Sequence, residues 1–156
     1  MEFTHLEEVL NRYGRELEQR YKWNVATASH DLQNTARFYI EHNGNRYEVG
    51  LNLQYYWYYE NNGRRAGKFP PISKIEEWIK IKPVIPREKN GYLPTEKQLA
   101  FLIARKIARE GTKGKHTFDN VVEELNNEML MSIKNALIED LGDEIERYII
   151  TLSNKK

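Results

Sequence analysis

Apolar residues recur every three or four positions in five stretches of the chain, the spacing of amphipathic α-helices. The first stretch predicts a helix over residues 3–21. Another helix is predicted from Thr95, which forms a capping box with Gln98, to about Arg109. Its apolar stripe consists of Leu99, Leu102, Ile103 and Ile107. The other stretches predict a short helix over 72–81, a long helix over about 118–140 that Gly142 ends, and a short helix over about 145–152.

Apolar and polar residues alternate between the first two predicted helices, which indicates β-strands. Phe38 and Ile40 share one face, Asn43-Gly44 predicts a tight turn, and a return strand follows over 46–53. A lone hairpin is marginally stable, so we expect the N-terminal helix and the long C-terminal helix to cover its apolar face. The expected fold is α+β: an N-terminal helix, an antiparallel β-hairpin or small sheet packed against a long C-terminal helix, and short helices and extended loops between. We expect a single domain over 1–156, with residues 153–156 as a frayed tail.

Residues 54–71 contain five consecutive aromatic residues, a loop rich in Gly and Arg, and a proline pair. Alternation predicts that two or three of Tyr55, Trp57 and Tyr59 pack inward. The run is a candidate platform for stacked bases. It is a better candidate for a subunit contact, because Tyr, Trp and Arg are enriched at interfaces. The candidate contact residues are Tyr55, Trp57, Tyr59, Phe69, Pro70, Pro71, Trp78 and Phe118.

Composition excludes several classes of protein. The 156 residues include no cysteine, which rules out a disulfide scaffold, cysteine-ligated zinc and thiol catalysis. No apolar run approaches the roughly 18 residues of a membrane-spanning helix, so we expect no membrane partner. The four histidines form no spaced pair of metal ligands. The segment from Gly63 to Phe69 lacks the spacing and hydroxyl of a phosphate-binding loop. We therefore expect no catalytic residues, no metal, no cofactor and no small-molecule substrate.

The formal net charge of +1 conceals a strong segregation of charge along the chain. Residues 60–115 carry 14 Lys and Arg against 6 Asp and Glu, a net charge of +8. Residues 116–156 carry 4 against 9, a net charge of −5. The basic segment is suited to a polyanion or to the acidic segment of an identical neighbour. A surface on which folding interleaves the charges is the simpler alternative.

A series of motifs gives the middle of the chain its most specific pattern. It begins with Gly63-Arg64-Arg65-Ala66-Gly67-Lys68-Phe69-Pro70-Pro71 and continues with Ile75-Glu76-Glu77-Trp78-Ile79. The run from Ala100 to Gly111, a Thr-Lys-Gly loop and Phe118 follow. This order resembles the neck or tail-completion proteins of tailed bacteriophages, a family of small head–tail joining proteins. The resemblance covers about residues 50–140, and the first 50 residues match in layout only.

The resemblance implies a structural virion protein without catalytic residues. Such proteins form a closed ring in the neck, between the portal–adaptor stack of the DNA-filled capsid and the tail, after assembly in the host cytoplasm. The implied partners are copies of the chain, portal or adaptor proteins, tail proteins and packaged DNA. A ring needs two different surfaces on each subunit, for which the +8 and −5 segments are candidates.

The resemblance also suggests roles for individual residues. Gly63 and Gly67 would permit backbone turns, and Phe69 and Trp78 would be hydrophobic anchors. Basic residues would contact DNA phosphates without reading bases, or would lie at a charged interface. These candidates are Arg64, Arg65, Lys68, Arg105, Arg109, Lys113 and Lys115.

Two other classes of function remain open from the sequence. The chain is alternatively a sequence-independent nucleic-acid-binding module that uses the basic 60–115 segment. Such a module binds DNA tightly as a monomer and with a steep salt dependence, whereas a connector binds free DNA weakly. A small cellular scaffold protein also fits the mixed charge of the helices.

Overall fold

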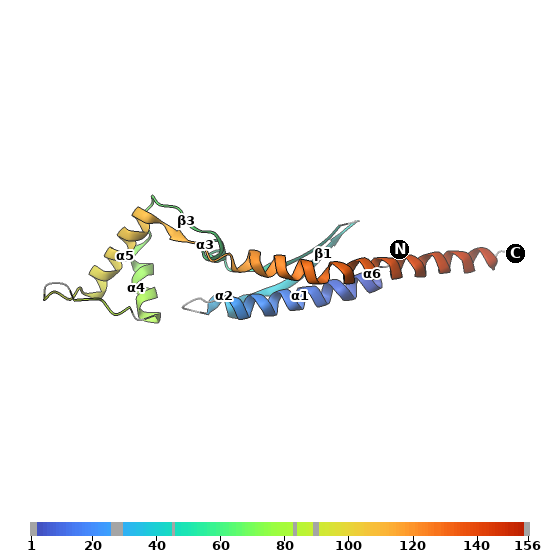
Figure 1. Cartoon of the computed structure of the whole chain (residues 1–156), viewed down its shortest axis with the longest axis horizontal. Coiled ribbons are helices and arrows are strands. Elements are labelled where there is room, and N and C mark those ends of the chain that lie inside the picture. Colours follow the sequence, from blue (N-terminus) through green and yellow to red (C-terminus); the bar gives the residue numbers. More distant parts are fainter. Residues whose placement is uncertain (1–2, 26–29, 45, 83, 89–90, 155–156) are drawn as a thin grey trace. The chain divides into compact units, whose positions relative to one another are not determined.

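The computed structural model describes residues 3–25, 30–44, 46–82, 84–88 and 91–154 (Figure 1). The chain forms two compact units. The first unit contains residues 1–24, 36–53 and 118–156, and the second contains residues 25–35 and 54–117. That these units act together as one domain over 1–156 stays a prediction.

The first unit begins with helix α1 (Thr4–Asn24), followed by a hairpin of strands β1 (Arg37–Asn43) and β2 (Arg46–Asn52). The strands are antiparallel, with Phe38 opposite Leu51 and Ile40 opposite Val49, so these apolar residues share one face as the alternation predicts. α1 contacts both strands. Gly14 of α1 makes this close packing possible, because a Cβ there would lie 2.4 Å from the ring of Phe38.

Helix α6 (Thr117–Ser153) completes the core of the first unit. Tyr13 and Leu17 of α1 form a buried cluster with Val121, Leu125 and Met129 of α6. Val49 and Leu51 of the hairpin pack against this cluster. The predicted α+β arrangement, in which the N-terminal helix and the long C-terminal helix cover the hairpin, is therefore confirmed.

The end of α6 differs from the sequence prediction. Gly142 was expected to end the long helix, but α6 continues through it for 37 residues in total. At 1.5 Å per residue this is a helix of about 55 Å. A single glycine in a helix costs about 1 kcal/mol relative to alanine, and without a proline the ladder of hydrogen bonds continues. The predicted fraying of 153–156 falls partly on residues 155–156, outside the described part of the chain.

The second unit consists of short elements joined by irregular segments. It begins with helix α2 (Asp31–Thr35), and helix α3 (Trp57–Asn62) leads directly into strand β3 (Gly63–Arg64). Helix α4 (Ile72–Ile81) has the predicted bounds, and residues 84–88 form neither helix nor strand. Helix α5 (Glu96–Glu110) is followed by strand β4 (Thr112–Lys113). None of the helices within the described ranges has both the length and the apolar run needed to cross a membrane.

Helices α4 and α5 pack against each other. Thr95 starts α5 with the predicted capping box: its Oγ1 accepts from the Gln98 amide, and its own amide donates to Gln98 Oε1 at 2.9 Å. Ala100 and Ala104 of α5 are fully buried, and Ile79 of α4 is nearly fully buried. Small side chains such as those of Ala100 and Ala104 allow a neighbouring helix to approach closely.

Candidate functional site

Two segments far apart in the sequence meet in the second unit, where β3 pairs with β4. Gly63 lies opposite Lys113, and Arg64 lies opposite Thr112, in antiparallel register. The pairing is extended by bonds from the Lys115 amide to the Glu60 carbonyl (3.0 Å) and from the His116 amide to the Asn61 carbonyl (2.9 Å). We call this contact between residues 60–64 and 111–116 the strand junction.

Glycines make the strand junction sterically possible. Gly63 and Gly111 end α3 and α5 with positive φ angles of 74° and 73°, a conformation that favours glycine. A Cβ on Gly63 would lie 2.2 Å from the Thr112 carbonyl oxygen, and one on Gly111 would lie 2.2 Å from that of Arg64. A Cβ on Gly114 would lie 2.3 Å from the Asn61 carbonyl oxygen. The expected role of Gly63 as a backbone turn is confirmed, and the glycines of both segments serve the same contact.

A buried carboxylate holds one side of the strand junction. The Glu60 side chain is 7% exposed, and its Oε1 accepts a hydrogen bond from the Thr117 hydroxyl at 2.9 Å. Lys115 Nζ lies 3.7 Å from the same oxygen. A buried charge needs both a partner of opposite charge and hydrogen bonds. Oε1 of Glu60 has both, whereas Oε2 is buried and has no hydrogen-bond partner among the described residues. These contacts fix the chain where it leaves β4 and enters α6.

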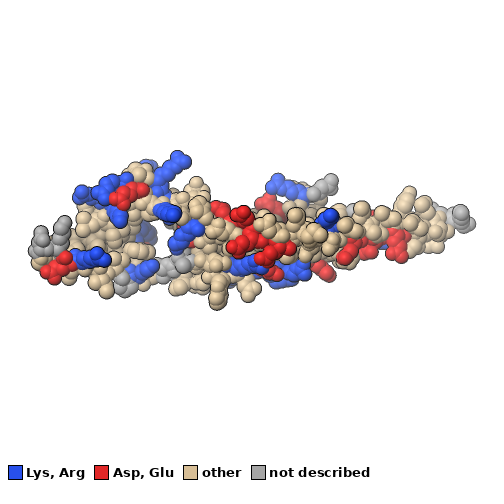
Figure 2. All heavy atoms as spheres, viewed as in Figure 1, with Lys and Arg blue, Asp and Glu red and all other residues tan. Residues whose placement is uncertain are grey.

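The strand junction brings together most of the basic candidates. Arg64 and Lys113 lie on its two strands, and Arg65 and Lys68 lie in the loop that follows β3. An Arg64 guanidinium nitrogen donates to the Lys68 carbonyl at 2.8 Å, and the Gly67 amide donates to the Ala108 carbonyl of α5 at 2.8 Å. The basic loop is therefore bonded to the last turn of α5 and is not a free loop. Figure 2 shows Lys and Arg gathered over α4 and α5.

The two remaining basic candidates lie on α5 and differ in their ionic partners. Arg109 forms a hydrogen-bonded ion pair with Glu110. This contact holds the pKa of the Glu110 carboxyl below its ordinary value. Arg105 is exposed, and no ion pair joins it to any described residue. Arg105 therefore keeps its full charge available to a partner.

The aromatic run behaves differently from the sequence prediction. Tyr55 and Tyr59 are 81% and 53% exposed, and Trp57 alone of the three predicted inward residues is half-buried. The prediction was wrong because it assumed the alternation of a strand, whereas residues 55–56 form a turn and α3 begins at Trp57. In a helical turn, neighbouring side chains point about 100° apart, so consecutive aromatic residues spread around the axis.

The other contact candidates occupy different places. The Phe69 ring packs on Phe101 of α5 with a centroid distance of 5.6 Å, and Pro70 is buried. Pro71 is exposed and precedes the first residue of α4. Trp78 on α4 is 37% exposed. Phe118 belongs to the first unit, where its ring meets Tyr21 edge-on at 6.2 Å, so it lies in a core contact of that unit.

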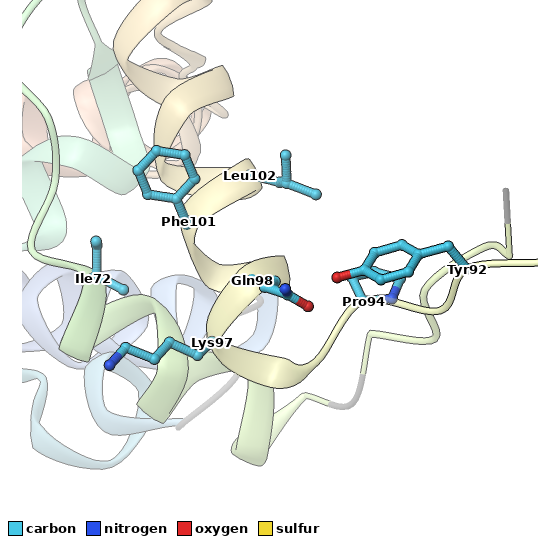
Figure 3. Close-up of a pocket in the computed structure, with 7 residues that line it drawn as sticks. All are labelled: Ile72, Tyr92, Pro94, Lys97, Gln98, Phe101 and Leu102. Carbon is cyan, nitrogen blue, oxygen red and sulfur yellow. The ribbon is translucent and has the colours of Figure 1, made fainter.

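A groove along α5 was not anticipated from the sequence. It has a volume of about 500 Å³ and is lined mainly by apolar groups from α5, the start of α4 and the segment that enters α5 (Figure 3). The helical stripe predicted Leu102 to be buried, but Leu102 is 49% exposed and lines this groove beside Phe101. Phe101, an apolar residue outside the predicted stripe, was the one signal of a second apolar face. The lining residues are Ile72, Tyr92, Pro94, Lys97, Gln98, Phe101 and Leu102.

Comparisons of the chain with models of protein families, with curated proteins and with solved structures found no match. A functional interpretation therefore depends on the residues and geometry described above. Within the described ranges, no group of three or more His, Asp or Glu side chains is placed to hold a metal ion. The arrangement offers instead a basic loop held by backbone bonds, exposed aromatic residues and an apolar groove, which are features of a binding surface.

Proposed function

We propose that this protein is a structural component of a tailed-phage virion, part of the neck or connector ring that joins the DNA-filled capsid portal to the tail and continues the DNA channel. One observation carries the proposal. Two of the blocks of sequence on which the resemblance rests, residues 63–71 and 100–114, meet in the strand junction and along α5.

The geometry gives a physical reason for the order of these motifs. At Gly63 and Gly111 the backbones of the two blocks lie so close together that a Cβ would collide with the other block. Phe69, which follows Gly63 in the sequence, packs its ring on Phe101 of α5, the helix that Gly111 ends. The basic residues of both blocks then lie on segments that backbone hydrogen bonds join to each other. Basic side chains held in this way suit a protein that contacts DNA phosphates without reading bases. Its other surfaces would contact neighbouring proteins.

The proposed partners follow from the same surfaces. Copies of the chain in a ring need two different faces, and the second unit is rich in Lys and Arg whereas α6 is acidic. Portal or adaptor proteins and tail proteins would bind the remaining surfaces, and packaged DNA would meet the basic loops. The protein would lie in the virion neck and pass through the host cytoplasm during assembly.

Quantitative mass spectrometry of gradient-purified particles tests this proposal. We expect the chain to sediment with DNA-filled capsids at a small, fixed copy number, about six or twelve for a closed ring. A major capsid protein measured in the same fractions provides the internal standard. Absence of the chain from purified particles would overturn the proposal.

The alternative function is a sequence-independent nucleic-acid-binding module. It is favoured by Arg65, Lys68 and Lys113, which are exposed and form no ion pair with any described residue. Such a module binds DNA tightly as a monomer, and its affinity falls steeply with salt. Tight binding by a monomer that is absent from particles would favour this alternative.

A further inference from the structure

The C-terminal part of α6 exposes a long apolar stripe. α1 begins beside Asp140, whose carboxylate accepts hydrogen bonds from the His5 and Leu6 amides at 2.9 Å. α6 continues past this point to Ser153, and in Figure 1 its last turns extend beyond α1 and the hairpin of the same unit. The apolar side chains there are 40–65% exposed: Leu137, Leu141, Ile145, Tyr148, Ile149 and Leu152.

The spacing of this stripe matches the helix closely. Apolar residues repeat every 11 positions, as in Leu130, Leu141 and Leu152, or Ile138 and Ile149. Eleven residues in three turns give about 3.67 residues per turn, so the stripe stays on one side of the helix over its whole length. At about 100° per residue, this side lies opposite the core residues Leu125 and Ala136. α6 therefore has two apolar faces, of which the first unit covers one.

An uncovered apolar helix face of this length indicates a partner. Isolated helices of about 12–15 residues are marginal in water, and most helical stability comes from packing of an apolar face. Residues 137–152 carry five acidic residues and one basic residue, Arg147, a net charge of −4. Asp140 is buried and Glu144 pairs with Arg147 at 3.3 Å, so the exposed acids without a basic partner in this segment are Glu139, Asp143 and Glu146. The partner that suits this segment is an apolar surface flanked by positive charge.

The groove on α5 has these properties. Phe101 and Leu102 are 46% and 49% exposed within it, and Tyr92 is 55% exposed at its side (Figure 3). Lys97 lines the groove, and Arg105 lies one helical turn beyond Phe101. Neither cation forms an ion pair with a described residue. The 15 residues of α5 span about 22 Å, close to the roughly 24 Å of the stripe from 137 to 152.

We propose that the outer stripe of α6, residues 137–152, docks into the α5 groove of a second copy of this chain. The mode is an amphipathic helix laid in an apolar groove, with anchors at Leu141, Ile145, Tyr148 and Leu152, spaced four, three and four residues apart. Charge selects this pairing, because stripe against stripe brings acidic residues together and groove against groove brings basic residues together. This inference rests on the proposed function, because the contact would join neighbouring subunits of the connector ring.

Such a contact is heterologous, since it joins two different surfaces. In an open chain of copies, the copy at one end keeps a free stripe and the copy at the other end keeps a free groove. Association therefore continues, and a ring forms where the rotation between neighbours closes. This property allows a test by complementation, which a symmetric contact would fail.

The experiment uses two variants of the full chain. The groove variant, Leu102→Glu with Arg105→Glu, keeps the stripe intact, and the stripe variant, Ile145→Lys with Ile149→Lys, keeps the groove intact. All four side chains are exposed. We expect the unmodified chain to self-associate in sedimentation velocity, with either variant weakening association at least about 30-fold, the loss of a hot-spot contact. An equimolar mixture of the two variants should form one-to-one dimers.

The matched control is Lys80→Glu with Ile81→Glu on α4, which makes the same kind of change at exposed positions outside the groove. It should associate like the unmodified chain. Circular dichroism checks that each variant is folded, and a second pair, Tyr92→Glu with Lys97→Glu and Leu141→Lys with Tyr148→Lys, replaces any variant that is not. The proposal is overturned if the unmodified chain stays monomeric, if the groove variant still self-associates, or if the mixture stays monomeric.

The two proposals fail in different ways. If the chain is found in particles but the variants do not complement each other, the contact is wrong and the connector function stands. If the variants complement each other but the chain is absent from particles, the contact stands and the connector function is wrong.

Discussion

Asp140 joins the start of α1 to the middle of α6. Its side chain is 2% exposed and accepts bonds at 2.9 Å from the His5 amide, the Leu6 amide and His5 Nδ1. Burial alone would raise the pKa of Asp140, but these hydrogen bonds outweigh it and hold the pKa below its ordinary value of 3.8. The bond to Asp140 raises the pKa of His5 above 6.5, with Asp143 and Glu139 adding to the effect.

The pair predicts a window of pH in which it stabilises the fold. The contribution of His5 is present below pH 6.5 and is lost as pH rises through its higher folded pKa. The contribution of Asp140 is present above pH 3.8 and is lost as pH falls through its lower folded pKa. We expect Asp140→Asn to lower the free energy of unfolding by about 1–2 kcal/mol at pH 6, because bonds to a charged acceptor are lost. The deficit should be smaller at pH 8, and urea unfolding followed by circular dichroism measures both values.

Asp143→Asn is the matched control for this prediction. Asp143 also faces His5, at 3.8 Å, but its side chain is 58% exposed and solvent screens the contact. Its substitution should change stability little at either pH. An Asp140→Asn deficit that is equal at pH 6 and pH 8 would show that His5 and Asp140 are not coupled.

Gly114 offers a test of the strand junction at a single residue. Its φ angle is not in the left-handed region, so alanine meets no backbone strain there, but its Cβ would lie 2.3 Å from the Asn61 carbonyl oxygen. We expect Gly114→Ala to separate the two segments and to destabilise the second unit by about 3 kcal/mol, as for an overpacked site. Hydrogen exchange of the Lys115 and His116 amides measures the loss of their bonds to residues 60 and 61.

Gly67→Ala is the control for the strand junction. Gly67 has a φ of 132°, and no described atom lies within 4 Å of the position its Cβ would take. Alanine there meets backbone strain of about 1–2 kcal/mol without a collision. Protection of the Lys115 and His116 amides should persist in this variant, and equal loss in both variants would contradict the steric explanation.

Among the elements, the continuity of α6 through Gly142 can be tested by one substitution. A Cβ at Gly142 would meet no described atom within 4 Å, so alanine adds helix propensity without a collision. We expect Gly142→Ala to stabilise the helix by about 1 kcal/mol and to slow hydrogen exchange over residues 138–150. Gly142→Pro should have the opposite effect, because proline breaks the hydrogen-bond ladder. No change in exchange with alanine would indicate that the helix already breaks there.

The elements that the sequence predicted well are those with local signals. The capping box at Thr95, the prolines before Ile72 and the Asn43-Gly44 turn each define a boundary through the residues beside it. α3 was missed because five aromatic residues in succession fit neither a helical nor an alternating pattern. The continuity of α6 was missed because Gly142 is a local signal that the rest of the helix overrides.

The candidate site was harder to predict for a different reason. The strand junction joins residue 63 to residue 113 through backbone atoms, and such a pairing leaves no periodic signal in the side chains. Its one trace in the sequence is the set of glycines at 63, 111 and 114. The reason for them, that a Cβ would collide with the opposite segment, is found only in the structure. Charge segregation, in contrast, could be counted directly, and it indicated the basic character of this unit.

For the whole molecule, the segregated charge distinguishes the two proposed functions by their response to salt. Each phosphate contact contributes about −0.9 to the slope of log affinity against log salt concentration for duplex DNA. Substitution of Arg65, Lys68 and Lys113 by Gln removes up to three such contacts without breaking an ion pair to a described residue. The matched control substitutes Lys80, Lys82 and Arg87, in α4 and the segment after it, by Gln. It changes the net charge equally at a different place, and it likewise breaks no ion pair to a described residue.

As a connector, the protein should bind free duplex DNA weakly at physiological salt, because its basic loops meet a DNA that the channel confines. Measured by fluorescence anisotropy across a salt series, the Arg65, Lys68 and Lys113 variant should reduce the slope by about two to three, and the α4 control should reduce it by less than one. Equal reductions of the slope by the two variants would mean that DNA binding depends on net charge alone, and that the loops at the strand junction are not a preferred binding site. Tight binding by the unmodified monomer would instead favour the nucleic-acid-binding module. Strong binding to DNA would oppose the movement of DNA through a connector channel.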